Sequence, residues 1–391
     1  MNQPHVVVIG GGATGAAVAH DLTLRGVCVT LVERGEVTSG TTGRHHGLLH
    51  SGARYAVKDQ ESAKECIEEN FILRKIAPGS FELNNGLFVA ITEEDMAYRP
   101  AFLEGLEVCG IPYKELTPQE ALAREPNLNP AVKAAVEVPD GTMDAMRIVL
   151  CFLATAQHHG ARILTYTEVE EILVQGKTVT GVRVRDHVTG KVYDIGADVV
   201  VNAGGAWAGK IAAMAGVHVP MQPSPGVLVA VYGRWNNMVL NRMHRSGDGD
   251  IIVPQRTLSV IGTSSWVVED PDKLEMKKEH IQLMYDYGAQ LVPAIRNAKL
   301  RAAWAAARPL IGSDGGAQTG RELSRTFKCF DHAERDGVEG FVTIAGGKAT
   351  TARGMAEVTA NVVVKKLGLD APCRTREVVL LPHTAYYRRR M

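Results

Sequence analysis

The chain has 391 residues, of which 45% are hydrophobic and 22% are charged, and this composition allows a globular core of ordinary size and about two domains. Lysine plus arginine and aspartate plus glutamate both total 43, so the charge balance excludes a protein that binds nucleic acid by bulk attraction. None of the six cysteines forms a C-x-x-C pair, which excludes the common zinc and iron–sulfur ligand sets, and we expect no metal site.

The first predicted elements are a strand, a glycine-rich turn, a helix and a second strand. Residues 6–9 form an apolar run typical of a buried parallel strand. Gly10, Gly12 and Gly15 follow at G-x-G-x-x-G spacing, which permits a tight turn, close approach of the backbone to a pyrophosphate, and packing of helix on strand. Glu33 ends the second strand, where a carboxylate binds ribose hydroxyls. This arrangement predicts a dinucleotide-binding unit.

Further elements follow along the chain. Periodicity and end signals predict a helix over 59–76, a strand over 86–91, a helix beginning at Thr117, a helix over 144–159 and a short strand over 162–166. The later part predicts a hairpin over 179–193, a buried strand over 198–202, several strands over 226–263, a strand over 341–344 and a helix from residue 348 to 367.

The dinucleotide-binding elements are not contiguous. We expect an α/β protein, α+β overall, in which a Rossmann-like dinucleotide-binding domain is interleaved with an antiparallel-sheet substrate domain, with the site between them. The expected ranges are 1–80, 145–212 and 335–370 for the first domain, 81–144 and 213–334 for the second, and 371–391 for a C-terminal tail.

Location is predicted from the same patterns. The sequence leads directly into the first strand without a signal peptide, and it has no apolar stretch of about 18 residues that would span a membrane. Scattered cysteines suit a reducing compartment, so we expect a cytoplasmic protein, or one held peripherally on the inner face of the cell membrane. Residues 386–390 are either a basic-aromatic contact for lipid headgroups or an acidic partner, or a solvated tail.

Five motifs resemble those of the FAD-dependent glycerol-3-phosphate dehydrogenases of the anaerobic large-subunit type, within the glycine oxidase/D-amino-acid oxidase superfamily. They are residues 9–15, 42–56, 138–142, 331–337 and 346–348, and the resemblance runs from about residue 5 to 380. It implies FAD as the cofactor of the dinucleotide-binding domain. It also implies oxidation of the C2 hydroxyl of sn-glycerol 3-phosphate to dihydroxyacetone phosphate by hydride transfer to flavin N5.

The expected cofactor-binding residues lie in the glycine turn, the loop after the second strand, the ends of two later strands and the start of the last helix. They are Gly10, Gly12, Ala13, Thr14, Gly15, Glu33, Arg34, Thr41, Thr42, His46, Gly47, Leu48, Val169, Ala203, Gly204, Trp207, Gly346, Gly347, Lys348 and Ala349. We expect Gly346–Gly347 to open the last helix and aim its N-terminus at the flavin N1 and O2 edge, where positive partial charge stabilises anionic reduced flavin.

The resemblance also implies the substrate-binding and catalytic residues. Arg54 is expected to bind the anionic group, with Tyr55 beside it, because an arginine fork suits phosphate or carboxylate. Arg308 and Lys348 are expected to favour the alkoxide that develops at the reacting hydroxyl. Arg325 is a further candidate for substrate binding. His50 and His46 are the candidates for the general base, since an imidazole of near-neutral pKa is the natural proton acceptor; the alternative for each is packing of the loop or a hydrogen bond to FAD.

Some positions depart from the family's pattern. Ala349 and Ala352 replace a larger apolar residue and a tyrosine, and we expect them to enlarge the pocket beneath the flavin. Asp250 precedes residues 251–254, where aerobic relatives have histidine; it would repel a phosphate, act as a base, or point to solvent. The family's cysteine-rich C-terminal domain is also missing from this sequence.

These departures leave two rival functions. One is the same fold acting on a 2-hydroxy acid, an amino acid or a larger polyol phosphate. The other is the FAD subunit of a multi-subunit electron-transfer dehydrogenase. The expected partners are therefore a small anionic substrate and an electron-transfer subunit or quinone, with oxygen as a third acceptor. The oligomeric state, homomeric or heteromeric, stays open.

Overall fold

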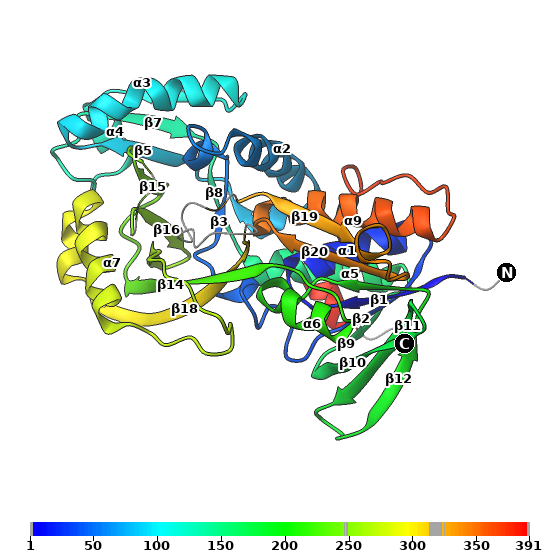
Figure 1. The fold of residues 1–391 in the computed structure, drawn as a ribbon. Coiled ribbons are helices and arrows are strands. Elements are labelled where there is room, and N and C mark those ends of the chain that lie inside the picture. The colour runs from blue at the N-terminus through cyan, green and yellow to red at the C-terminus, as the bar shows by residue number, and fades with distance from the viewer. Residues whose placement is uncertain (1–2, 246, 248, 313–322, 324, 389–391) are drawn as a thin grey trace.

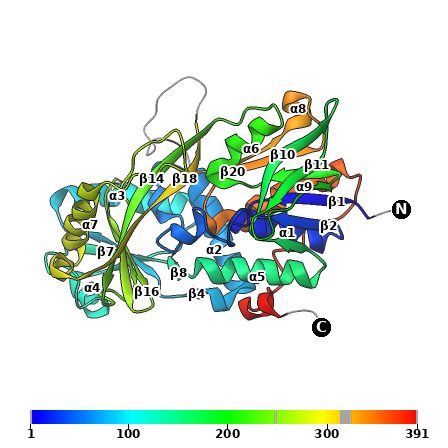
Figure 2. The ribbon, with the colours of Figure 1, turned by 90° about the horizontal axis from the view of Figure 1, so that it is seen from below.

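The computed structural model describes residues 3–245, 247, 249–312, 323 and 325–388 (Figure 1). Two large sheets lie side by side along the molecule, and helices pack on both of them (Figures 1 and 2). The fold is of the mixed α/β type expected from the sequence, with a parallel and an antiparallel sheet.

The first sheet has six strands in the order β19-β20-β13-β1-β2-β9, and its edge strand β19 runs antiparallel to its neighbour. The strands are β1 (His5–Ile9), β2 (Cys28–Val32), β9 (Arg162–Leu164), β13 (Val199–Asn202), β19 (Phe327–Asp331) and β20 (Phe341–Gly346). Segments from distant parts of the chain thus lie together. The carboxyl ends of the parallel strands meet at one edge, where open α/β sheets bind ligands.

Alternate residues of β1 enter two different cores, because side chains alternate across a strand. Val6 and Val8 pack with helices α1 (Ala13–Leu24), α5 (Ala145–His158) and α9 (Ala352–Lys366). Val7 and Ile9 pack with a three-stranded sheet made of β10 (Thr167–Gln175), β11 (Thr178–Asp186) and β12 (Val192–Gly196). Both faces of the strand are therefore buried, which explains its uninterrupted apolar run. Figure 2 shows the six-stranded sheet between these layers.

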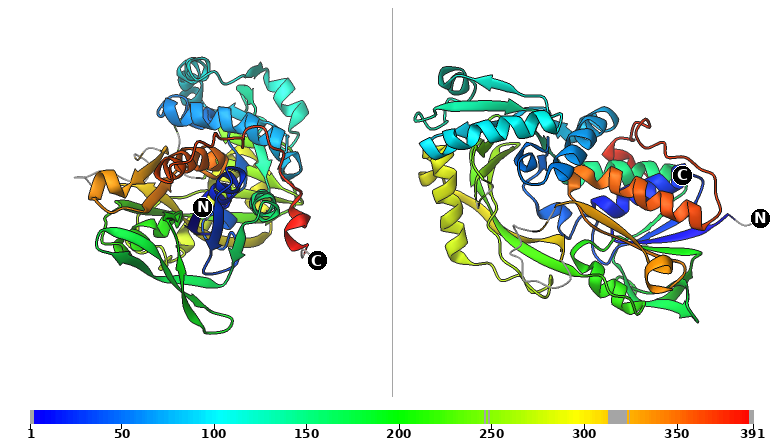
Figure 3. Two further views of the ribbon diagram at one scale, coloured as in Figure 1. Left: turned by 90° about the vertical axis from the view of Figure 1, so that its right-hand side faces the viewer. Right: turned by 45° about the horizontal axis from the view of Figure 1, so that its top comes forward.

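The second sheet has eight strands in the order β18-β14-β17-β16-β15-β5-β7-β6. They are β5 (Gly86–Ala90), β6 (Lys114–Leu116), β7 (Ala134–Val138), β14 (Met221–Tyr232), β15 (Val239–Arg242), β16 (Ile251–Gln255), β17 (Leu258–Gly262) and β18 (Leu300–Ile311). Its pairs are antiparallel except β5 with β15, which is parallel. Helix α7 (Lys278–Leu291) packs on this sheet, and α3 (Glu93–Val108) lies beside β7 (Figure 3).

Strands β14 and β18 connect the two halves. They pair from Met221 with Ile311 to Val231 with Leu300. Val231 packs in the core beneath α7, whereas Met221 and Ile311 pack against the core of the six-stranded sheet. These two strands therefore hold the two sheets at a set distance and border the space between them (Figure 1).

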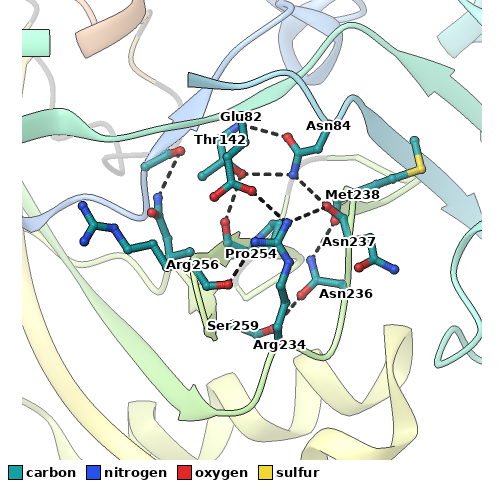
Figure 4. A network of polar contacts seen from close by, with 12 residues as sticks. Glu82, Asn84, Thr142, Arg234, Asn236, Asn237, Met238, Pro254, Arg256 and Ser259 are labelled. Atoms are coloured by element: carbon teal, nitrogen blue, oxygen red, sulfur yellow. Dashed lines mark hydrogen bonds and ion pairs between the residues drawn. The ribbon is translucent and has the colours of Figure 1, made fainter. Parts of the chain in front are cut away.

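A small fourth sheet joins the two halves on another side. It consists of β3 (Leu48–Leu49), β8 (Gly141–Met143) and β4 (Phe81–Glu82). Figure 4 shows the polar network that ties it to the eight-stranded sheet: the Thr142 hydroxyl donates to the Pro254 carbonyl at 3.0 Å, and Arg234 pairs with Glu82 at 2.8 Å. Asn84 donates to the Asn237 carbonyl at 2.7 Å. The network fixes β4 and β8 against the eight-stranded sheet.

Two of the expected helices begin directly after a residue whose side chain caps the helix N-terminus. Helix α2 (Gln60–Ile76) is capped by Asp59, which accepts from the Ser62 amide. Helix α4 (Pro118–Arg124) begins with a capping box between Thr117 and Glu120. The remaining elements are α6 (Ala208–Met214), α8 (His332–Asp336) and the 3-10 turns η1 (Thr42–Arg44), η2 (Ala53–Tyr55), η3 (Pro78–Ser80), η4 (Gly205–Trp207), η5 (Pro293–Asn297), η6 (Ala349–Thr351) and η7 (His383–Tyr387).

The start of the last helix differs from the expectation. Gly346 and Gly347 do not open it; both have positive φ, 81° and 70°, a left-handed conformation that an α-helix excludes. The 3-10 turn η6 follows, and α9 begins at Ala352. In the part of the chain that the structure describes, none of the helices is both long and apolar enough to cross a bilayer. Of the tail segment 386–390, residues 389 and 390 lie outside the described part.

Candidate active site

A cavity of about 2040 Å³ lies between the two sheets, at the carboxyl ends of β1, β2, β13 and β20. Its opposite wall comes from β14 and β18, through Gly226, Leu228, residues 303–306 and residues 308–310. The volume exceeds the roughly 300–1,000 Å³ usual for a small-ligand pocket. The cavity therefore has room for a dinucleotide and a second small molecule.

The glycine turn at the end of β1 fits a dinucleotide's pyrophosphate. Gly10 has φ 110°, and a Cβ there would lie 2.6 Å from the Ala203 carbonyl oxygen. A Cβ on Gly15 would overlap the Gly10 carbonyl oxygen, so this glycine serves helix-to-strand packing. Gly12 caps α1 without a side chain, and the helix N-terminus opens towards the cavity. Amide groups at a helix N-terminus bind phosphate.

Glu33 is oriented by the backbone around it. Its Oε2 accepts from the Gly11 amide at 2.7 Å, and its Oε1 accepts from the Gly35 amide at 2.9 Å. Each carboxylate oxygen retains a further lone pair. The side chain lines the cavity and can take ribose hydroxyls in the way the sequence predicts.

The loop after β2 contacts both sides of the cavity. The Thr41 hydroxyl donates to the Ala307 carbonyl of β18 at 2.6 Å, and the Thr42 hydroxyl accepts from the Ala13 amide at 3.1 Å. The Trp304 indole donates to the Arg44 carbonyl at 2.7 Å. These contacts fix the loop against the second sheet, so that the histidines which follow it face the cavity.

Three histidines lie deep in the protein with their rings partly open to the cavity. Burial lowers the pKa of His45 to about 4 and that of His46 to about 3, and it places the pKa of His50 well below its usual value. All three are therefore neutral at pH 7. His45 Nδ1 accepts from the Gly47 amide at 2.8 Å. Among the described residues, His46 Nδ1 has no hydrogen-bond partner, although it is buried.

Asp250 is buried and paired with Arg54. The two charged groups approach to 2.6 Å, Asp250 also accepts from the Gly247 amide at 2.9 Å, and its exposed fraction is 1%. The alternative that Asp250 points to solvent is thus wrong. Burial opposes its ionisation, but Arg54, His244 and the Gly247 amide outweigh burial and lower its pKa to about 2. It does not line the cavity itself but stands behind Arg54.

Arg308 is hydrogen-bonded to carbonyl and hydroxyl oxygens among the described residues, whereas Arg54 is paired with a carboxylate. Its guanidinium donates to the Ser264 carbonyl at 2.9 Å and to the Ser224 carbonyl at 3.1 Å, and it bonds the Thr263 hydroxyl. Within the described residues, these hydrogen-bond partners are all neutral oxygens. Burial, with Arg325 nearby, lowers the pKa of Arg308 to about 9. Among the residues that the structure describes, no carboxylate is hydrogen-bonded to its guanidinium.

Lys348 reaches the cavity from the loop after β20. Its Nζ donates to the Ser62 hydroxyl at 2.5 Å and to the Arg325 carbonyl at 2.8 Å, and it lies 4.9 Å from the centre of the Tyr55 ring. The Arg325 amide donates to Asp59 at 2.9 Å. The N-terminus of α2 thereby positions both cationic residues.

The structure brings most of the predicted site residues to one cavity. Those that line it are Gly10, Gly12, Ala13, Thr14, Glu33, Arg34, Thr41, Thr42, His46, Leu48, His50, Arg54, Tyr55, Val169, Ala203, Gly204, Trp207, Arg308, Arg325, Gly346, Gly347, Lys348 and Ala349. Gly15, Gly47 and Asp250 do not. A Cβ on Gly47 would meet Gln255, so this glycine serves loop packing. Ala352 packs in the core below α1 rather than lining the cavity, so only Ala349 of the two alanines affects its shape.

Sequence analysis missed one group of lining residues. Pro271, Asp272, Leu274 and Met276 come from the irregular segment between β17 and α7, and Lys210 comes from α6. The segment has neither a motif nor a periodic pattern, so no sequence signal would have identified it.

Known proteins share both the sequence and this geometry. Residues 5–361 match the family described as FAD dependent oxidoreductase. The chain is 45% identical over 377 residues to one subunit of the anaerobic glycerol-3-phosphate dehydrogenase of Escherichia coli strain K12, covering 96% of this chain and 69% of that protein. It is 46% identical over 387 residues to a subunit of the anaerobic glycerol-3-phosphate dehydrogenase of Haloferax volcanii, covering 96% of this chain and 66% of that one. The chain thus spans about two thirds of the length of these relatives.

Solved structures show the same fold. The glycerol-3-phosphate dehydrogenase from Bacillus halodurans complexed with FAD has a TM-score of 0.73 at 25% identity, covering 97% of this chain and 68% of that one. The L-proline dehydrogenase from P. horikoshii has a TM-score of 0.75 at 24% identity, covering 93% and 94% of the two chains.

Proposed function

The chain belongs to the family of FAD-dependent oxidoreductases, with FAD as its cofactor, and from that premise we propose that it oxidises the C2 hydroxyl of sn-glycerol 3-phosphate to dihydroxyacetone phosphate. The observation that carries the substrate is the convergence of Arg308, Arg325, Arg54 and Lys348, from separate segments, on one cavity. Such a cluster suits a small dianion. The relatives named above act, by their names, on glycerol 3-phosphate.

The residues present fit FAD. The backbone at Gly10 and Gly12 lies so close to neighbouring residues that a side chain at either position would fill the space left for the pyrophosphate. Glu33 is held where it can bind the ribose. The left-handed backbone at Gly346 and Gly347 and the wall residue Ala349 leave space for a flat ring. When bound, the flavin supplies the two-electron oxidation.

We assign the phosphate to Arg308 rather than to Arg54. The sequence predicts Arg54 as the anion-binding residue, but its charge is balanced by Asp250 at 2.6 Å. Arg308 is bonded to neutral oxygens only, within the described chain, and lies in a poorly solvated wall. A buried cation without a counter-ion gains most from an incoming anion. Arg325 adds a second positive charge beside it.

Lys348 is assigned to the reacting hydroxyl. Its Nζ is held by Ser62 and Arg325 and cannot swing freely into the cavity. A fixed ammonium group stabilises the alkoxide as the hydroxyl proton leaves. His46 is the preferred proton acceptor, because its buried Nδ1 has no partner among the described residues. A pKa of about 3 makes it a weak base, and a bound dianion nearby raises that pKa.

The electrons must leave the protein after each turnover. The relatives are named as subunits, so they belong to assemblies of more than one chain. We infer that reduced cofactor in this protein is reoxidised by a partner subunit or by a quinone.

Anaerobic bleaching of the flavin band at about 450 nm tests the function. Addition of sn-glycerol 3-phosphate to purified protein should bleach the band, whereas the mirror-image sn-glycerol 1-phosphate and lactate should not. A protein that is yellow but is bleached only by a 2-hydroxy acid or an amino acid would retain the cofactor and overturn the substrate.

A further inference from the structure

A segment without helix or strand, residues 263–277, crosses from the second sheet to the first; we call it the strap. It joins β17 to α7. Its first half runs beside β14, since the Trp266 amide donates to the Pro225 carbonyl at 3.2 Å and the Val268 amide donates to the Pro223 carbonyl at 3.1 Å. The strap is therefore guided along β14 towards the six-stranded sheet.

The far end of the strap is attached by two carboxylates. Asp272 accepts from the Trp207 indole at 2.8 Å and pairs with Arg34 at 3.0 Å and Lys210 at 2.8 Å. Asp270 pairs with Lys210 at 2.7 Å. The Arg34 guanidinium also lies 4.5 Å from the centre of the Trp207 ring. Three side chains from two separate segments, Arg34 after β2 and Trp207 with Lys210 after β13, thus converge on Asp272.

These contacts suit a reversible attachment. The Arg34 and Asp272 side chains are 44% and 41% exposed, and single ion pairs of that exposure contribute little. Several such contacts on one carboxylate together hold the segment more firmly than any one of them alone. Burial opposes the ionisation of Asp272, but Lys210, Trp207 and Arg34 outweigh burial and lower its pKa to about 2, so it stays ionised throughout the physiological range.

The attached end lines the cavity beside the residues expected to bind the cofactor's ribose. Asp272, Leu274 and Met276 line the same cavity as Glu33. Arg34 directly follows Glu33, whose carboxylate is placed to bind the ribose. The attachment therefore adjoins the end of the cavity where Glu33 is placed to bind the adenosine half of the cofactor.

We propose that the strap is a clasp that retains FAD: Asp272, held by Arg34, Trp207 and Lys210, closes the adenosine end of the cavity, and FAD leaves only when this attachment opens. The other end of the strap holds Arg308 through Thr263 and Ser264. The same segment therefore connects closure over the cofactor to the placement of the phosphate-binding arginine. This inference rests on FAD as cofactor, and extends the proposed function.

The test compares the release of FAD from Asp272→Ala with that from a matched control, Asp286→Ala. Asp286 is an aspartate on α7 with a side chain 48% exposed, paired with Arg296 at 3.8 Å. After dilution of the loaded protein, the rise of free-FAD fluorescence gives the release rate. We expect release to be at least about ten-fold faster in Asp272→Ala and nearly unchanged in Asp286→Ala, because altered contacts act mainly on dissociation.

A second variant and a proteolysis assay test the same attachment independently. Lys210→Met removes the same attachment from the opposite side and should also speed release, with the far-UV spectrum unchanged. Trypsin should cut after Lys273 or Lys277 faster in loaded Asp272→Ala than in loaded wild type. Equal release rates in Asp272→Ala, Lys210→Met and wild type would overturn the clasp. A wild type that binds no FAD would instead overturn the cofactor.

Discussion

The carboxylate of Asp250 lies 2.6 Å from the guanidinium of Arg54, and their side chains are only 1% and 12% exposed. The pair joins the 3-10 turn after β3 to the segment before β16. It offsets one positive charge in a cavity that Arg308, Arg325 and Lys348 also line. The pair therefore decides which arginine is available for an anionic substrate.

Breaking this pair should destabilise the protein. Asp250→Asn or Arg54→Met leaves the other charge buried without its counter-ion, which costs about 3–5 kcal/mol in free energy of unfolding. The double variant should lose less free energy of unfolding than the two single variants lose in sum. Urea unfolding of the four proteins measures this. Arg183→Met, which breaks an exposed pair with Asp194, should barely move the curve; an equally small effect of Asp250→Asn would contradict the prediction.

Replacing Arg308 should impair turnover and spare cofactor binding. Arg308→Lys keeps the charge but loses the planar fork, so kcat/KM for sn-glycerol 3-phosphate should fall about 100-fold, with FAD content unchanged. Arg301→Lys, at the exposed start of the same strand, is the control and should behave as wild type. Steady-state rates with an artificial acceptor give the comparison. An unaltered KM and kcat in Arg308→Lys would exclude it from substrate binding.

Glu65 should make stability depend on pH. Burial raises its pKa to about 7; Lys348 opposes the shift, and Glu61, Asp59 and Glu69 add to it. The folded-state pKa lies above the unfolded value, so the stability that the protonated group contributes is complete below about pH 4.5 and is lost as the pH rises through 7.

Glu65→Gln should therefore be more stable than wild type at pH 8, by about 1 kcal/mol once screening of this half-exposed group is allowed for, and similar to it at pH 5. Melting temperatures of the two proteins from pH 5 to 8 measure the difference. A difference in melting temperature that stays constant from pH 5 to 8 would contradict the titration of Glu65 in this range.

Gly12→Ala should weaken FAD binding without unfolding the chain. Gly12 has φ −81°, which alanine adopts freely, and its added Cβ would lie 3.1 Å from the Thr42 hydroxyl oxygen. The methyl group would occupy the space that the pyrophosphate needs, so the Kd for FAD should rise at least about ten-fold. Gly79→Ala meets nothing within 4 Å and is the matched control. Titration of cofactor-free protein with FAD measures both; equal affinities would refute the role of Gly12.

Local signals predicted most of the elements that build the site. The signals for the cofactor-binding unit are local: the apolar run of β1, the glycines after it and Glu33 all lie in the first 33 residues. Their geometry follows from backbone sterics and turn chemistry. Asp59 and Thr117 identified the starts of their helices for the same reason. The helix after Gly347 began later than expected, because two consecutive glycines adopted a left-handed backbone that pattern alone does not reveal.

The sequence by itself determined the cofactor-binding unit, the family and the set of cationic candidates, since each depends on residues close together in the chain. Only the tertiary structure decided how their charges are balanced. Arg54 and Asp250 are 196 positions apart, and Arg34 and Asp272 are 238 apart. Burial, which makes the three histidines neutral, is likewise a property of packing. Long-range contacts and desolvation leave no periodic trace in a single sequence, so they appear only when the chain is folded.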